Sequence, residues 1–179
     1  PGVEIAIADE YDKVLPPDTV GEILIKGSSL MNGYWRLPEA TAKTLRDGWL
    51  HSGDAGYLDQ EGFLYIYDRV KDMIVSGGEN VYPAEVESAL YEHPAVQDVA
   101  VIGVPSDKWG EAVKAVIVKK QGAVVSESEL ISFAKQKIAG YKVPKSVDFT
   151  DLLPRNASGK LLKKDIRAPY WEGMDRQIN

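Results

Sequence analysis

Two charged side chains of this chain combine the residue type and the setting that nucleotide recognition needs. Asp54 follows a glycine at the end of a strand-like segment, where a carboxylate can accept hydrogen bonds from both hydroxyls of a ribose. Arg69 offers a rigid fork of N–H donors to ribose and phosphate oxygens. The alternatives are a solvated aspartate in a turn and a surface ion pair of Arg69 with Asp68 or Asp72. The residues themselves leave both interpretations open.

Glycines mark two other places where chemistry can occur. Gly77 and Gly78 permit positive φ and let a ligand approach the backbone closely, but a glycine pair before a helix is also an ordinary turn. Lys160 ends a glycine-containing loop that can carry its ammonium into a site formed by another domain. The alternative for Lys160 is an exposed lysine in a basic tail.

The segment before these glycines has the pattern of a small β-rich unit. Residues 3–8 and 21–26 alternate in the manner of strands on either side of a turn-forming stretch, so we expect them to pair antiparallel. Residues 38–45 predict a short helix that opens with proline. Because the unit is short and opens within a strand pattern at Pro1-Gly2, we expect it to be the end of a larger domain. Further strands are expected at residues 49–51, 56–59 and 63–67.

A charged joint and then an alternation of helix and strand follow. Residues 68–72 interrupt the β-rich pattern with alternating charge, which is typical of a joint between two strands. Pro83 suits the first turn of a helix. The apolar run 99–104 is typical of a strand buried on both faces, and Ser126 with Glu129 matches a capping box ahead of a further helix. These patterns predict an α+β fold, with other strands at residues 111–118 and 147–149 and a closing helix at 161–168.

Composition and charge exclude several classes of protein. The 179 residues are 44% hydrophobic and 27% charged, as in ordinary soluble globular proteins. The absence of cysteine excludes a disulfide scaffold and thiolate metal sites, and two histidines disfavour a histidine-rich centre, so we expect no metal ligands in this chain. No apolar run approaches the roughly 20 residues that span a bilayer, and no signal-peptide pattern is present, so we expect a cytoplasmic protein. Residues 140–179 hold eight basic and five acidic residues against a net charge of −6, which suits an anionic small ligand better than nucleic acid.

Three motifs in a fixed order carry a resemblance to a known family. They are Gly48-Trp49-Leu50-His51-Ser52-Gly53-Asp54, Ser76-Gly77-Gly78-Glu79-Asn80-Val81-Tyr82-Pro83 and Pro154-Arg155-Asn156-Ala157-Ser158-Gly159-Lys160. Over nearly its whole length the chain resembles the C-terminal portion of the adenylate-forming superfamily, which includes acyl-CoA synthetases, luciferases and peptide-synthetase adenylation domains. The second motif looks most like fatty acyl-CoA ligases.

The resemblance implies an organisation into domains. Residues 1–69 would be the β-rich, barrel-like end of a large N-terminal adenylation domain, and residues 70–72 a hinge that pivots at Lys71. Residues 73–179 would be a mobile C-terminal α+β domain of a few strands with flanking helices. Some relatives carry aspartate at the pivot, so the place of Lys71 is more telling than its charge.

The resemblance also implies a reaction. A fatty acid or related carboxylate would attack ATP to give acyl-AMP and pyrophosphate with Lys160 as the catalytic residue, and CoA would then replace AMP after the domain turns. Asp54 and Arg69 would bind the nucleotide, as would Asn80. The remaining site residues, Gly77 and Gly78, would line the CoA channel. Some relatives carry a lysine where this chain has Val75, so acyl-adenylate contacts cannot be transferred to that position.

The resemblance makes the chain part of an acid–thiol ligase rather than a whole one. The phosphate loop, the acyl pocket and the residues that bind Mg²⁺ with ATP belong to the preceding domain of the family, so we expect the 179-residue chain to be inactive by itself. Two alternatives remain open. One is another adenylate-forming enzyme, such as a peptide-synthetase module or a luciferase-like oxygenase, and the other is a non-catalytic binding or regulatory protein derived from the C-terminal half.

Overall fold

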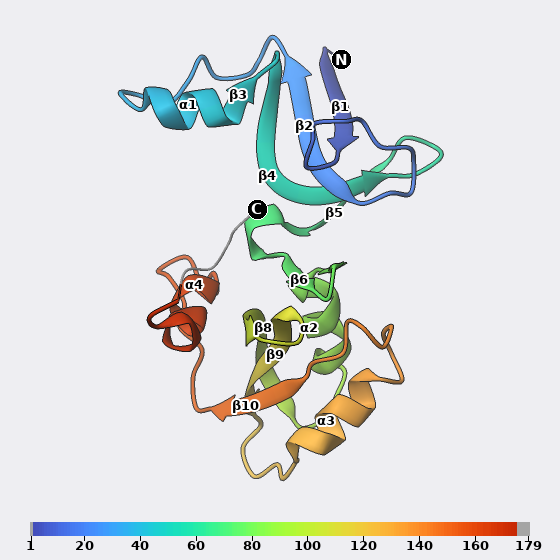
Figure 1. Ribbon diagram of the computed structural model, residues 1–179, viewed down its shortest axis with the longest axis vertical. Helices are drawn as coiled ribbons and strands as arrows, with labels where there is room; N and C mark the ends of the chain where they lie inside the picture. Colours follow the sequence, from blue (N-terminus) through green and yellow to red (C-terminus); the bar gives the residue numbers. More distant parts are fainter. Residues whose placement is uncertain (1, 175–179) are drawn as a thin grey trace. The chain divides into compact units, whose positions relative to one another are not determined.

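The computed structural model describes residues 2–174 and divides the chain into two compact units, Pro1–Lys71 and Asp72–Asn179 (Figure 1). The division falls within the expected hinge, residues 70–72, which forms the short 3-10 helix η1 (Val70–Asp72). Each unit contains one five-stranded sheet. The expected α+β fold is therefore confirmed, while residues 175–179 of the expected second domain lie outside the described part.

The first unit is a curled antiparallel sheet with the strand order β1-β2-β4-β3, and β5 also pairs with β4. The long strand β4 bends strongly in Figure 1, and register shifts that mark β-bulges interrupt its pairing with both β2 and β5. A small core of Ala6, Ala8 and Leu24 packs against Trp49. The elements are β1 (Val3–Ala8), β2 (Gly21–Gly27), α1 (Pro38–Thr44), β3 (Leu45–Arg46), β4 (Trp49–Leu58) and β5 (Leu64–Arg69).

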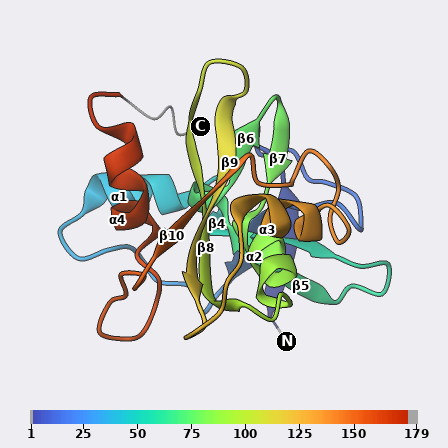
Figure 2. The same cartoon turned by 90° about the horizontal axis from the view of Figure 1, so that it is seen from below.

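The second unit is a mixed sheet with helices on both faces. Strand β9 pairs antiparallel with β8 and β6 and parallel with β10, and β7 completes a hairpin with β6. Figure 2 shows α2 and α3 lying together, with α4 on the other side of β10. The elements are β6 (Ile74–Ser76), β7 (Glu79–Val81), α2 (Pro83–Tyr91), β8 (Val96–Ser106), β9 (Gly110–Lys119), α3 (Glu127–Ala134), β10 (Ser146–Thr150), α4 (Lys163–Arg167) and the 3-10 helix η2 (Ala168–Trp171).

Strand β8 confirms the interpretation of its apolar run as a strand covered on both faces. Val99 and Val101 belong to the larger hydrophobic core, whereas Ala100 and Ile102 belong to a second core that also includes Ile166 of α4. Successive side chains of a strand point to opposite faces, so a strand between two helical layers needs apolar residues at every position. Unit two is thereby a three-layer structure.

The starts of two helices, α3 and α4, can be compared with the positions that the sequence predicts. The capping box at the start of α3 is present, because the Ser126 hydroxyl accepts from the Glu129 N–H while the Glu129 carboxylate accepts from the Ser126 N–H. The closing helix is shorter than expected and begins only at Lys163. Leu161 instead forms a bridge with Arg155, and the Leu162 N–H donates to the Pro154 carbonyl at 2.9 Å. Backbone pairing with Pro154 and Arg155 thus replaces the first helical turn.

Candidate functional site

Asp54 and Arg69 come together because β4 and β5 pair in a register that places one directly opposite the other. Arg69 Nε lies 2.7 Å from Asp54 Oδ1 and 3.3 Å from the Gly53 carbonyl oxygen. Both side chains remain more than a third exposed, at 37% and 38%. The guanidinium therefore pairs with Asp54, and Asp68 accepts a hydrogen bond from the Arg69 backbone N–H. The arrangement presents a carboxylate and a fork of donors together at the surface.

Glu22 supports the turn that leads into Asp54 and was not anticipated from the sequence. One oxygen of its carboxylate accepts from the Gly53 N–H at 3.0 Å, and the other lies 2.9 Å from His51 Nδ1. Arg46 Nε donates to His51 Nε2 at 3.0 Å. His51 thus contacts both Glu22 and Arg46. The only sign of this role in the sequence was that Glu22 is the one acidic residue in the strand pattern of residues 21–26.

Gly77 and Gly78 form the two-residue turn of the β6–β7 hairpin, and their φ angles are +64° and +87°. Two successive positive φ values define a type I′ turn, which strongly favours glycine. A Cβ on Gly77 would lie 2.8 Å from the Trp109 ring, whereas a Cβ on Gly78 would meet no atom within 4 Å. Asn80 follows on β7, where it is exposed. Gly77 therefore allows Trp109 to pack closely against the turn, whereas the space beside Gly78 is open.

Trp109 is the second residue that the sequence did not single out. Its carbonyl accepts from the Gly77 N–H at 2.9 Å, and the residue is 38% exposed. The ammonium groups of Lys108 and Lys145 lie 4.5 Å and 5.7 Å from the ring centroid, within the range of cation–π attraction. An aromatic surface with two positive charges therefore adjoins the glycine turn.

Lys160 lies at the end of a second hairpin, residues 155–161, here called the Lys160 hairpin. The Asn156 N–H donates to the Lys160 carbonyl at 3.0 Å. The Asn156 side-chain oxygen accepts from the Ser158 N–H at 3.0 Å and from the Lys160 N–H at 2.9 Å. Gly159 makes the turn with a φ of +82°. Hydrogen bonds among its own residues thus set the shape of the hairpin, while the Lys160 side chain is exposed.

The remaining predicted residue, Lys71, is exposed and lies in η1 at the boundary of the two units. Among the predicted site residues, the structure pairs Asp54 with Arg69 in the first unit. In the second unit, residues 77–80 share one hairpin and Lys160 lies on another.

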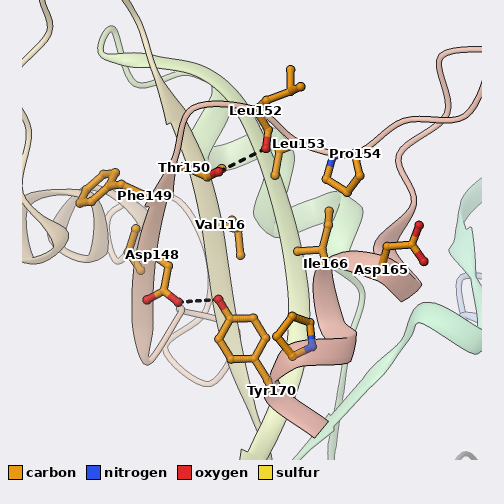
Figure 3. Close-up of a pocket in the computed structure, with 12 residues that line it drawn as sticks. Val116, Asp148, Phe149, Thr150, Leu152, Leu153, Pro154, Asp165, Ile166 and Tyr170 are labelled. Carbon is orange, nitrogen blue, oxygen red and sulfur yellow. Dashed lines mark hydrogen bonds between the residues drawn. The ribbon is translucent and has the colours of Figure 1, made fainter. Parts of the chain in front are cut away.

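A pocket of about 720 Å³ lies in the second unit, between β10 and α4, and contains none of the predicted site residues (Figure 3). Asp148 accepts a hydrogen bond from the Tyr170 hydroxyl at 2.5 Å and pairs with Lys114 at 2.8 Å. Burial, reinforced by the hydrogen bond to Asp148, raises the pKa of Tyr170 to about 12. Burial works to raise the pKa of Asp148, but the hydrogen bonds from Lys114 and Tyr170 outweigh burial and hold that pKa below its usual value. These groups stabilise the interface between strand and helix.

Two further structural findings bear on cofactors and location. Within residues 2–174, no three His, Cys, Asp or Glu side chains are placed so as to hold a metal ion. The helices in that range are also too short or too polar to cross a bilayer.

Comparison with known proteins places this chain in a family. Residues 85–160 match the model of the AMP-binding enzyme C-terminal domain. Feruloyl-CoA synthase of an Amycolatopsis species is 51% identical over 93% of this chain and 34% of that protein. The fatty acid–[acyl-carrier-protein] ligase ScoC of Streptomyces coeruleorubidus is 44% identical over 100% of this chain and 34% of that protein.

A solved structure agrees with these relatives. ATP-bound MatB from Rhodopseudomonas palustris matches with a TM-score of 0.88 and 42% identity, over 95% of this chain and 34% of that one. The chain thus spans about a third of the length of the relatives it matches. Residues 85–160 thus form an AMP-binding enzyme C-terminal domain, and the chain is similar to the C-terminal part of ligases of the adenylate-forming superfamily.

Proposed function

We propose that this chain is the C-terminal part of an ATP-dependent, AMP-forming acyl-CoA ligase, an acid–thiol ligase that converts a carboxylate, ATP and CoA into acyl-CoA, AMP and pyrophosphate. The observation that carries the proposal is the exposed Lys160 on a hairpin fixed by its own hydrogen bonds, inside the residues that match the family model. A feruloyl-CoA synthase among the relatives supports CoA as the acceptor. The similarity to ScoC supports a fatty acid as the carboxylate.

In the first step, the carboxylate attacks the α-phosphate of ATP and pyrophosphate leaves. Negative charge builds between the nucleophile and the phosphate, and the Lys160 ammonium would neutralise it. Asp54 would accept hydrogen bonds from the ribose hydroxyls, and the terminal N–H groups of Arg69 would reach ribose or phosphate oxygens. Their mutual ion pair orients both groups before the nucleotide binds.

In the second step, the thiol of CoA attacks the acyl-AMP carbonyl and AMP leaves. The second unit would turn about Lys71 and withdraw Lys160, so that the glycine hairpin takes its place. The open space beside Gly78 would accommodate the pantetheine arm, with Asn80 near the adenylate. Trp109 would form one wall, and the positive charges of Lys108 and Lys145 suit the phosphates of CoA.

Mg²⁺ would accompany ATP, and its ligands would come mainly from the rest of the enzyme. The phosphate loop and the acyl pocket would also belong to that part. The partners of this chain are therefore ATP, CoA, a carboxylic acid and the remainder of its own enzyme.

The proposal is tested on the complete polypeptide that contains this chain. We expect carboxylate-dependent exchange of pyrophosphate into ATP, and acyl-CoA as the product detected by mass spectrometry across a panel of fatty and aromatic acids. Offering a carrier-protein thiol in place of CoA tests the alternative acceptor that the similarity to ScoC raises. The 179-residue chain alone should show no exchange. If the complete polypeptide shows none with any carboxylate, a binding or regulatory role replaces the enzyme.

A further inference from the structure

Two ion pairs tie the Lys160 hairpin to the body of the second unit. At the start of the hairpin, Arg155 NH2 lies 2.7 Å from Asp98 Oδ2 on β8. Just beyond its end, Lys163 Nζ lies 2.8 Å from Glu87 Oε1 on α2. The Lys163 pair is well buried, with side-chain exposures of 12% and 14%, and Glu87 also accepts from the Val101 N–H of β8 at 2.8 Å. The hairpin is therefore anchored on both sides.

Asp98 is itself held in place from more than one direction. Its Oδ1 accepts from the Val99 N–H at 3.0 Å and from the hydroxyl of Tyr91 at the end of α2. Burial works to raise the pKa of Asp98, but the hydrogen bonds from Arg155 and Tyr91 outweigh burial and keep that pKa below its usual value. Asp98 is thus a charged group with little freedom to move.

Arg155 connects this fixed carboxylate to the turn next to Lys160. One terminal nitrogen of its guanidinium, Nη2, donates to Asp98, and the other, Nη1, donates to the Gly159 carbonyl at 2.8 Å. The guanidinium is planar and rigid, so one end of the fork cannot shift without moving the other. Gly159 immediately precedes Lys160, and the position of its peptide group sets where the Lys160 side chain begins.

We infer that Asp98 and Tyr91 are positioning residues for Lys160 and act on it through Arg155. The inference rests on the proposed catalytic role of Lys160. A catalytic charge must reach its place within a fraction of an ångström to be effective, and an exposed hairpin by itself does not provide that precision. The chain from Tyr91 and Asp98 to the Gly159 carbonyl transfers the rigidity of β8 and α2 to the hairpin.

The first test measures hairpin order in the 179-residue chain and needs no catalysis. Site-resolved hydrogen exchange reports the Lys160 N–H, which is bonded to Asn156. In Asp98→Asn we expect this amide to exchange about tenfold faster, because a charged partner of Arg155 is lost. The matched control is Glu92→Gln, which breaks the exposed pair of Glu92 with Lys137 and should leave the amide unchanged. Unchanged exchange in Asp98→Asn would overturn the inference.

The second test separates the two half-reactions in the complete enzyme. Asp98→Asn should slow adenylate formation about tenfold and leave thioester formation from supplied acyl-AMP unaffected. Arg155→Lys should act in the same direction, because lysine cannot bind Asp98 and Gly159 through one rigid fork. Tyr91→Phe removes one hydroxyl and serves as the milder variant where Asp98→Asn does not fold.

A double variant distinguishes positioning from general stability. When Lys160→Ala is already present, Asp98→Asn should cause no further loss of adenylate formation, because it acts only through Lys160. A further loss of similar size, or equal slowing of both half-reactions, would show that Asp98 is merely structural. If Lys160→Ala itself leaves adenylate formation intact, the proposed function fails, and the exchange measurement still judges the order of the hairpin separately.

Discussion

Asp54 and Arg69 lie on paired strands of the first unit, whereas Lys160 lies on a hairpin outside both sheets. The backbone register positions the first two side chains, and each satisfies the charge of the other at 2.7 Å. Lys160 has no ion-pair partner among residues 2–174, and side chains such as Asn156 and Arg155 hold its backbone. The chain therefore positions its candidate charged side chains in two different ways, by an ion pair between strands and by hydrogen bonds to the backbone of a hairpin.

The proposed function explains this difference by what each charge would do. An exposed ion pair contributes no more than about 1 kcal/mol, so a nucleotide can compete for Asp54 and Arg69 at small cost. A lysine that enters a site formed elsewhere must not be committed to a partner in its own unit. Its backbone can nevertheless be rigid, because rigidity there reduces the conformational entropy lost on entry.

The largest expected effect comes from Lys160→Ala. Removing a preorganised charge should slow adenylate formation in the complete enzyme by about 10² or more and spare thioester formation from supplied acyl-AMP. The measurement is pre-steady-state kinetics of each half-reaction. Lys164→Ala, at an exposed lysine of α4, is the control and should change neither. Equal slowing of both steps by Lys160→Ala would contradict the separation of roles between the hairpins.

Asp54→Asn tests the ion pair between Asp54 and Arg69 in the first unit. The variant keeps the shape of the side chain but removes the charge that orients Arg69 and that, in the proposed function, would accept hydrogen bonds from the ribose. Hydrogen bonds to charged groups contribute about 1.5–3 kcal/mol, so the KM for ATP should rise roughly 10- to 100-fold while kcat falls less. Glu61→Gln, at an exposed carboxylate of the same unit, provides the baseline. An unchanged KM would remove Asp54 from the nucleotide site.

Gly78→Leu sharpens the comparison by testing the other hairpin of the second unit. A leucine side chain would enter the open space beside Gly78, so thioester formation should slow about tenfold while adenylate formation continues. The positive φ of +87° adds backbone strain of about 1 kcal/mol or more to the variant. Gly122→Leu imposes similar strain at a φ of +76°, also in open space, and controls for it. Comparable slowing in both variants would argue against a CoA channel at Gly78.

The smallest expected effect concerns Tyr170, which lies outside both sites. Its pKa is raised from 10.0 to about 12, so the folded state favours the protonated phenol. The resulting stabilisation is fully present below pH 10 and is lost as the pH rises toward 12. Denaturant titrations at several pH values should show a stability loss in this window that is smaller in Tyr170→Phe. A similar loss in both proteins would assign the effect to other groups.

Several features of this protein were determined by local sequence. The capping box of α3, the two-faced apolar pattern of β8 and the α+β order of the elements were all predicted, because each depends on residues within a few positions of one another. The order of the three motifs likewise indicated the superfamily. The sequence singled out Asp54, Arg69 and Lys160 as candidate residues, but it did not show which other residues hold them in place.

Tertiary structure decided which residues support the candidate site. Arg155 binds Asp98 across 57 positions of sequence, and Glu22 reaches the Gly53 N–H across 31. Trp109 covers Gly77. Such contacts depend on strand register and chain topology, which bring distant residues together without leaving a periodic pattern in the sequence. The residues that could do chemistry are therefore visible in the sequence, whereas the side chains that hold them in place appear only when the sheets are assembled.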